Sequence, residues 1–320
     1  MSFQKFVLTA VAGLGMASAA MADGRNPGSL LLYPEFDNRA GVVTVLTITN
    51  TDAAGDDVDV EFVYIGRYDQ SGDVDCEEFN RTETLTANDT LTLLTNFHNP
   101  QHEQGYVYAF ARDGVNSPIA HNWLIGNVMT VEGLTAFEYS VNPVAYEAIN
   151  PEVDNNGVRK LDGNQYEQSP NEILVPRFLG QGGNFHSELI LIGLTGGAAF
   201  DTTVDFLIYN DNEEIFSSEH TFYCWDRVYL TDISGIFDNS FLADFTNNDP
   251  QELYGAPMIE TGWFRMTGAQ ASSASTTIPD PAFYAVLVER IDSKGAADLP
   301  FEAGQNASGA LLARSLDGQF

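Results

Sequence analysis

The hydrophobic residues of this chain recur with a period of two, in short runs that end in turn signals. The run Val58–Tyr64 alternates apolar with mostly acidic positions, which is typical of a half-buried β-strand. The run Val42–Thr49 is rich in β-branched residues and ends at the turn signal Asn50–Asp52. After residue 22, no segment of twelve residues carries a convincing helical stripe of apolar side chains. The chain is therefore predicted to be all-β.

The order of these strand-like runs is repeated once along the chain. Pro34-Glu35-Phe36 follows a run of leucines, and Pro176-Arg177-Phe178 follows a similar Ile/Leu run. Collinear self-similarity of this kind indicates a duplicated unit, and the drifting spacing is what loop insertions produce. The runs 44–48, 60–63, 85–93, 105–106 and 118–125 have echoes, in the same order, at 188–192, 204–207, 222–230, 262–263 and 281–288.

Each copy has the size and strand number of a β-sandwich. We expect two tandem, related antiparallel β-sandwiches joined end to end, immunoglobulin-like or jelly-roll-like in architecture, at residues 28–146 and 172–293. The polar stretch 147–171 is predicted to be a linker, and the second copy carries an insertion at about 237–261. Residues 294–320 are rich in Ala, Gly and Ser and are predicted to form a flexible C-terminal tail.

The first 22 residues have the three parts of a secretory signal. Lys5 supplies the positive charge, residues 6–16 are apolar, and Ala20-Met21-Ala22 matches the A-x-A cleavage pattern. We therefore expect a signal peptide at 1–22 and an exported chain that begins at Asp23. No later stretch approaches the 18 or more apolar residues of a membrane helix, so no membrane span is expected.

The chain is strongly acidic, with 45 Asp and Glu against 14 Lys and Arg and a net charge of −31. This balance excludes nucleic acids and anionic lipid surfaces as partners, because both are bound through clustered basic residues. Divalent cations are the one cofactor worth considering. Asp69, Asp73 and Asp75 offer oxygen ligands of the kind calcium prefers. The EF-hand order is absent, so a solvated acidic loop is the alternative.

The two cysteines, Cys76 and Cys224, lie in different copies of the repeat. In an oxidising compartment a single disulfide between them is the economical interpretation. That bond would cross between the two sandwiches. A pair of unlinked thiols is the alternative, and the sequence leaves both open.

The insertion in the second copy gathers aromatic residues, namely Phe237, Phe241, Phe245 and Tyr254. Large aromatic side chains in a loop can form a binding face for a carbohydrate or a peptide. They can equally well anchor the insertion to the sandwich. The sequence does not choose between these roles.

No HExxH, GxSxG, P-loop or CxxC motif occurs in the chain. We therefore expect a non-catalytic, exported acidic protein of the cell surface, extracellular matrix or periplasm, with a structural, adhesive or partner-binding role. One alternative is a secreted carbohydrate-active hydrolase with an Asp/Glu pair, which requires a pocket holding a carboxylate of raised pKa. A second alternative is an outer-membrane β-barrel. The sequence gives no indication of the oligomeric state.

Overall fold

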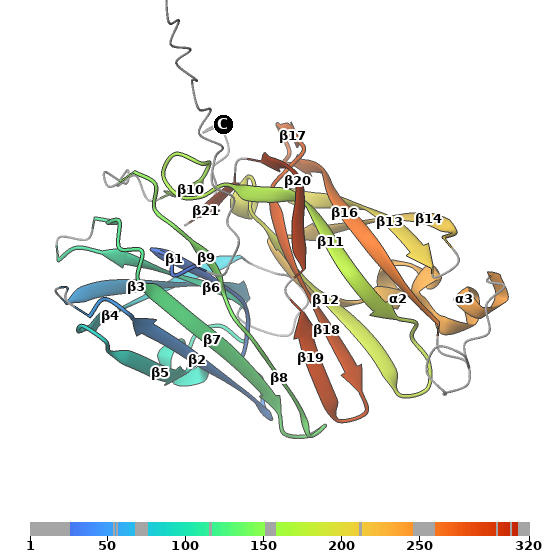
Figure 1. The fold of residues 1–320 in the computed structure, drawn as a ribbon, viewed down its shortest axis with the longest axis horizontal. Helices are drawn as coiled ribbons and strands as arrows, with labels where there is room; N and C mark the ends of the chain where they lie inside the picture. Colours follow the sequence, from blue (N-terminus) through green and yellow to red (C-terminus); the bar gives the residue numbers. More distant parts are fainter. Residues whose placement is uncertain are drawn as a thin grey trace, which may run out of the picture.

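The computed structural model describes residues 26–53, 55, 57–67, 76–114, 117–150, 158–210, 213–245, 260–298, 300–307 and 309–312. The predicted signal peptide lies outside these ranges, as do Tyr254 and the calcium candidates Asp69, Asp73 and Asp75. The described chain is built of antiparallel β-sheets with a few short helices (Figure 1). The predicted all-β fold is therefore confirmed.

The first sandwich packs a five-stranded sheet, in the order β4-β3-β6-β1-β9, against the four strands β5-β2-β7-β8. Neighbouring strands in both layers pair antiparallel. The strands are β1 (Leu30–Asp37), β2 (Val42–Asn50), β3 (Val58–Arg67), β4 (Glu77–Leu85), β5 (Thr90–Leu94), β6 (Gln104–Arg112), β7 (Leu124–Glu132), β8 (Phe137–Val141) and β9 (Val144–Tyr146).

The second sandwich packs the sheet β14-β13-β16-β11-β20, with β17 paired to β16, against the strands β15-β12-β18-β19. A separate ribbon pairs β10 with β21. The strands are β10 (Val158–Leu161), β11 (Ser169–Leu179), β12 (Phe185–Gly193), β13 (Asp201–Asn210), β14 (Ile215–Tyr223), β15 (Trp225–Tyr229), β16 (Thr261–Ser272), β17 (Thr277–Pro279), β18 (Phe283–Ile291), β19 (Lys294–Asp298), β20 (Phe301–Ala307) and β21 (Gly309–Leu312).

The helices are all short and connect strands. Within the described ranges, none is both long and apolar enough to cross a membrane. They are α1 (Thr95–His98), α2 (Leu230–Ile233) and α3 (Asn239–Phe245), with single 3-10 turns η1 (Gly197–Ala199) and η2 (Gly235–Phe237). Helix α1 follows β5 and α2 follows β15, so these two helices occupy equivalent positions in the two copies.

The two sandwiches have the same strand order. In the outer sheets, β4-β3-β6-β1-β9 corresponds strand for strand to β14-β13-β16-β11-β20. In the facing layers, β5-β2-β7-β8 corresponds to β15-β12-β18-β19. Two related tandem sandwiches, as predicted from the echoes in the sequence, are therefore what the chain forms.

The opening strand of each copy has a bulge at the proline of the echo. The pairing of β1 with β6 shifts register at Pro34, and that of β11 with β16 shifts at Pro176. Proline has no N–H to donate to the ladder, and a bulge removes that demand. The phenylalanine after each bulge lies opposite a glycine, Gly105 or Gly262. A Cβ at Gly262 would lie 2.7 Å from the ring of Phe178, so the glycine is required there.

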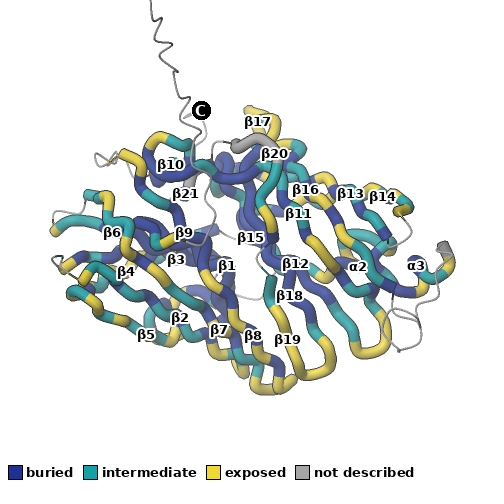
Figure 2. Tube along the Cα trace, in the orientation of Figure 1, coloured by how far each residue is buried: buried dark blue, intermediate teal, exposed yellow. Residues whose placement is uncertain are grey.

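The sequence predicted sandwiches joined end to end. In the structure they also lie side by side. Strands β8 and β19 lie side by side (Figure 1) and meet in a parallel bridge between Glu138 and Lys294, which joins the two facing layers into one eight-stranded sheet. In addition, β1 contacts β12 and β6 contacts β15. Every residue of the run Leu189–Ile192 in β12 is fully buried, although neighbouring side chains point to opposite faces. The layer β15-β12-β18 therefore lies between its own outer sheet and the first sandwich (Figure 2).

The C-terminal segment differs from the predicted flexible tail. Residues 294–312 contain β19 and β20, which complete the second sandwich as counterparts of β8 and β9, and β21. Small residues are needed here, because a Cβ at Gly295 would lie 2.4 Å from the ring of Phe137. The predicted linker likewise contains β10 and the start of β11. The limits of the two domains themselves stay predictions.

Candidate functional site at the junction of the sandwiches

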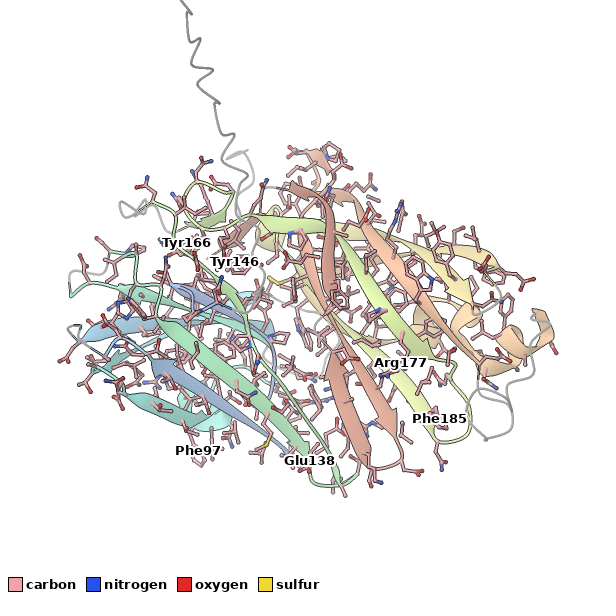
Figure 3. The ribbon with its side chains drawn as sticks, in the orientation of Figure 1. Phe97, Glu138, Tyr146, Tyr166, Arg177 and Phe185 are labelled. Atoms are coloured by element: carbon pink, nitrogen blue, oxygen red, sulfur yellow. A yellow bond between two sulfur atoms is a disulfide. The ribbon has the colours of Figure 1, made fainter. Side chains whose placement is uncertain are left out.

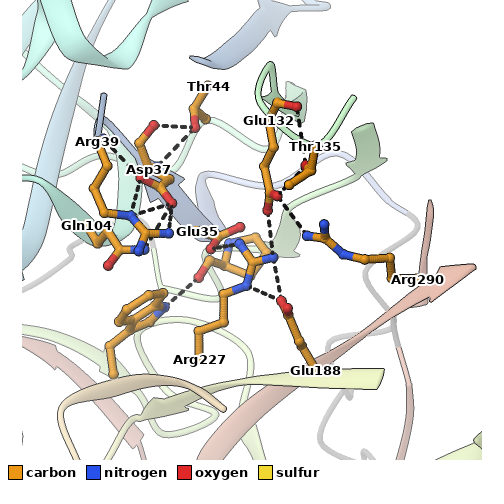
Figure 4. A network of polar contacts seen from close by, with 12 residues as sticks. Glu35, Asp37, Arg39, Thr44, Gln104, Glu132, Thr135, Glu188, Arg227 and Arg290 are labelled. Atoms are coloured by element: carbon orange, nitrogen blue, oxygen red, sulfur yellow. Dashed lines mark hydrogen bonds and ion pairs between the residues drawn. The ribbon is translucent and has the colours of Figure 1, made fainter. Parts of the chain in front are cut away.

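A single arginine, Arg227 on β15, gathers acidic side chains from both sandwiches (Figure 4). Its Nη1 donates to Oε1 of Glu35 on β1 at 2.7 Å, and its Nε donates to Oε2 of Glu188 on β12 at 2.5 Å. Its Nη2 lies 3.3 Å from Oε1 of Glu132 at the end of β7. One guanidinium thus binds two strands of the first sandwich and one of the second.

The charges in this cluster are buried, and their pKa values reflect it. Burial raises the pKa of Glu35 to about 7, although the charge of Arg227 opposes the shift. Burial also disfavours the charged form of Arg227, but attraction to Glu35 and Glu188 is stronger and raises the pKa of Arg227. Within the described residues, Oε2 of Glu35 has no hydrogen-bond partner. Glu35 is therefore a buried carboxyl of which only one oxygen is hydrogen-bonded.

Two further groups extend the cluster. Arg290 of β18 donates to Oε2 of Glu132 at 2.8 Å and lies 3.6 Å above the centroid of the Phe137 ring. Burial raises the pKa of Glu132, but its bonds to Arg290 and Thr135 outweigh burial, so the net shift is downward. Nearby, the indole of Trp225 donates to the carbonyl of Pro34 at 2.9 Å. We call Glu35, Glu132, Glu188, Arg227 and Arg290 the junction cluster.

A cavity of about 400 Å³ adjoins the junction cluster. Three arginines line it, together with the acids Glu132, Glu188 and Asp226. Each of these acids is paired, since Asp226 lies 2.9 Å from His220 and the other two contact Arg227. Glu35, the carboxylate of raised pKa, does not line the cavity and is 1% exposed. Among the described residues, each carboxylate that lines the cavity therefore already contacts an arginine or a histidine of the protein.

A disulfide reinforces the same junction. Cys76 at the start of β4 and Cys224 at the bend between β14 and β15 are bonded, with their Cα atoms 6.0 Å apart. Of the two alternatives that the sequence left open, the structure has the bond. It links the sandwiches across 148 residues of sequence.

The aromatic residues predicted as a binding loop are placed differently from one another. Phe237 is 1% exposed and packs edge-on against Phe178 at 5.0 Å, so it belongs to the core. Phe241 is half-buried and contacts the ring of Phe216 at 5.5 Å. Phe245 ends α3, and Tyr254 lies outside the described residues. The two aromatics whose side chains are described therefore anchor the insertion.

No group of three metal-ligating side chains occurs in the part of the chain that the structure describes. The acidic loop at 69–78 lies largely outside that part, so its calcium site stays a prediction. The junction cluster itself was missed by the sequence analysis. One signal was available: in a chain with only 14 basic residues, Arg227 and Arg290 both lie within strands of the second copy.

Comparisons with known proteins place the chain in no family. No family model matches it, and no curated protein matches it. Among solved structures, the tandem CBM22-1–CBM22-2 domain of Paenibacillus barcinonensis Xyn10C shares 13% identity over 86% of this chain and 85% of that one, with a TM-score of 0.19. The empty particle of cowpea mosaic virus shares 10% over 97% and 99%, with a TM-score of 0.18. At such TM-scores neither likeness carries an argument.

Proposed function

We propose that this chain is a non-catalytic, exported acidic protein of the cell surface, extracellular matrix or periplasm, which acts by holding a protein or carbohydrate partner. The observation that carries the proposal is the state of the junction cluster. Among the described residues that line the cavity between the sandwiches, Arg39, Glu132, Glu188, Arg227 and Arg290 are held in ion pairs within the protein, and Asp226 contacts His220. Such a junction supports a rigid two-domain body.

The hydrolase alternative rests on buried carboxyls of raised pKa, namely Glu35 and Glu289, of which Glu289 is bonded to Arg177 and does not line the cavity. A general acid must come within hydrogen-bond reach of the bond it protonates. Glu35 instead is 1% exposed and does not line the cavity, whereas Arg227, which donates to it, does. The same pKa is expected for a buried carboxylate with one unsatisfied oxygen. We therefore favour binding over hydrolysis.

The decisive experiment measures binding and hydrolysis together. The purified protein is incubated with a panel of insoluble polysaccharides and with cells of the source organism. Protein removed from solution and reducing ends released are both measured. We expect no release of reducing ends by the wild type. Release that Glu35→Gln abolishes, while the exposed control Glu219→Gln does not, would establish the hydrolase instead.

Export is tested separately. The pattern at 20–22 predicts a mature protein that begins at Asp23. N-terminal sequencing of the protein from the culture medium or the periplasm measures this directly. Full-length protein that starts at Met1 and is confined to the cytoplasm would contradict the proposed compartment.

A further inference from the structure

In the first sandwich, the sheet β4-β3-β6-β1-β9 packs one of its faces against the second sandwich. On β3 and β6, the side chains of Val63, Ile65, Tyr106 and Tyr108 point away from the core of their own sandwich, because their neighbours Phe62 and Val107 point into it. All four are nonetheless less than 5% exposed. Strands β12 and β15 of the second sandwich lie against this sheet.

The counterpart face of the second sandwich is open. By the repeat, Val63, Ile65, Tyr106 and Tyr108 correspond to Leu207, Tyr209, Trp263 and Arg265. Trp263 is 38% exposed and stacks parallel to Tyr209, with ring centroids 4.3 Å apart. At the two edges of the same face, Ile215 is 60% and Phe301 57% exposed. The same face also carries the charged residues Asp205, Glu219 and Arg265. We call its apolar part, Leu207, Tyr209, Ile215, Trp263 and Phe301, the open sheet face.

The layer that receives such a face also has an open counterpart. In the molecule, the outer sheet of the first sandwich packs on β12 and β15, and these correspond to β2 and β5. The solvent-facing side chains of β2, β5 and the adjacent β7 include no charged residue, in a chain with 45 acids. We call this surface the uncharged face. It comprises Val43, Val45, Thr47, Thr49, Thr90, Thr92, Leu94, Ile125, Asn127, Met129 and Val131.

We infer that the open sheet face of one copy of this chain docks on the uncharged face of a second copy. The contact repeats between molecules the packing that the two sandwiches already have within one molecule. It joins two different surfaces, so it is heterologous, and each docked copy leaves one face of each kind free. Interfaces of this type build open chains or rings rather than closed dimers. The inference goes beyond the proposed function and holds whatever partner the protein binds.

A second copy fits these surfaces better than an unrelated ligand does. Each face is the counterpart of a face that is covered within the molecule, so this arrangement of strands already packs in that way once. The uncharged face also removes the main obstacle to contact between two polyanions. Two molecules of net charge −31 repel each other through solvent, and salt screens that repulsion. Association should therefore strengthen as salt is added, whereas a contact made by opposite charges would weaken.

The experiment uses sedimentation velocity and light scattering on the full chain. For the wild type, we expect the average mass to rise with protein concentration past that of a dimer, and to rise further at high salt. Two variants each block one face with a charge: Thr47→Glu on the uncharged face, and Trp263→Glu on the open sheet face. Each variant alone should stay monomeric. An equimolar mixture should form a heterodimer of twice the monomer mass and stop there.

Several results would overturn the inference. They are a wild type that stays monomeric at every concentration and salt, a single variant that still dimerises, or a mixture that stays monomeric although both variants melt like the wild type. Loss of polysaccharide binding by Trp263→Glu with no change in mass would assign Tyr209 and Trp263 to a sugar site instead. Ile215→Lys provides a second block of the open sheet face if Trp263→Glu fails to fold. Ser275→Glu, in the exposed turn before β17, is the control and should assemble like the wild type.

Discussion

Strands β2 and β12 are counterparts in the repeat, and they differ in how many of their faces are buried. Strand β2 alternates buried residues such as Leu46 and Ile48 with partly exposed ones. Strand β12 contains the continuous buried run Leu189–Ile192. A strand with one face in solvent alternates apolar and polar residues, and a strand covered on both faces is apolar throughout. Duplication thus produced two copies of one topology, and stacking turned one facing layer into an interior one.

The bulge position shows the same difference in its charges. Glu35 of the first sandwich is buried and binds Arg227 across the junction. Its counterpart Arg177 has a half-exposed side chain and pairs with Glu289 and Asp298 within its own sandwich (Figure 3). The residue at the bulge therefore has a different role in each copy. Glu35 binds across the junction, whereas Arg177 forms ion pairs within its own sandwich.

The largest effect is expected from removal of the arginine at the centre of the junction. Arg227→Met would leave Glu35 and Glu188 buried without their counter-charge. Breaking a buried ion pair by removing one partner costs about 3–5 kcal/mol of the free energy of unfolding. The counterpart of Arg227 in the first sandwich is Thr92, which is exposed. Thr92→Met should change the free energy of unfolding by less than about 0.5 kcal/mol.

Urea unfolding of both variants at low protein concentration measures the comparison. Equal small losses for Arg227→Met and Thr92→Met would mean that the two facing layers do not differ in the way described. Such a result would also remove the junction cluster as the element that fixes the two sandwiches to each other.

The next largest effect is expected from loss of the disulfide. Cys76→Ser/Cys224→Ser removes a cross-link between the sandwiches, and native disulfides typically contribute about 2–4 kcal/mol. Because the bond crosses the junction, its loss should lower the midpoint of thermal unfolding and make the junction more accessible to hydrogen exchange than the strands β3 and β13. Unchanged unfolding after removal or reduction of the bond would contradict this assignment.

The topology was accessible from the sequence because it depends on local patterns. Alternation located the strands, and the Pro-x-Phe echo located the bulges and their facing glycines. The register of β12 was not accessible. The echo pairs residues 44–48 with 188–192, but the structure pairs Val45 with Leu94 and Glu188 with Tyr229, each just before its helix. Val45 therefore corresponds to Glu188, one residue later than the echo implies. A strand that is apolar on both faces gives no period with which to fix its register.

The junction cluster was inaccessible for a different reason. Glu35 and Arg227 are separated by 192 positions in the chain, and Glu132 lies between them in sequence. Nothing local distinguishes these carboxylates from the rest of the 45 acids. Their proximity follows from the stacking of one sandwich on the other, which the predicted end-to-end arrangement would not produce.

A smaller effect tests the buried second face of β12 directly. Ile190 pairs with Arg227 and therefore points toward the first sandwich. Ile190→Thr removes an apolar contact and buries a hydroxyl without an assigned partner, which together cost about 2 kcal/mol. The reciprocal change in the counterpart, Thr47→Ile, alters a half-exposed position of β2 and should stay within about 0.5 kcal/mol. Comparable losses in these two variants, measured by urea unfolding, would show that β12 is covered on one face only.

The smallest effect is a pH dependence of the free energy of unfolding, and it arises from Glu35 at the bulge of the first sandwich. Burial raises the pKa of Glu35 to about 7 from its ordinary value of 4.5. The folded protein therefore binds a proton at Glu35 more readily than the unfolded chain does, and stability falls as pH rises between these two values. One pKa unit corresponds to about 1.4 kcal/mol, so between pH 5.5 and 7 the wild type should lose about 1–2 kcal/mol relative to Glu35→Gln. Glu219→Gln, at an exposed position of β14, keeps Glu35 and should preserve the wild-type slope. Parallel curves for the wild type and Glu35→Gln, measured by urea unfolding across this range, would show that Glu35 stays ionised in the folded protein and that Arg227 compensates fully for its burial.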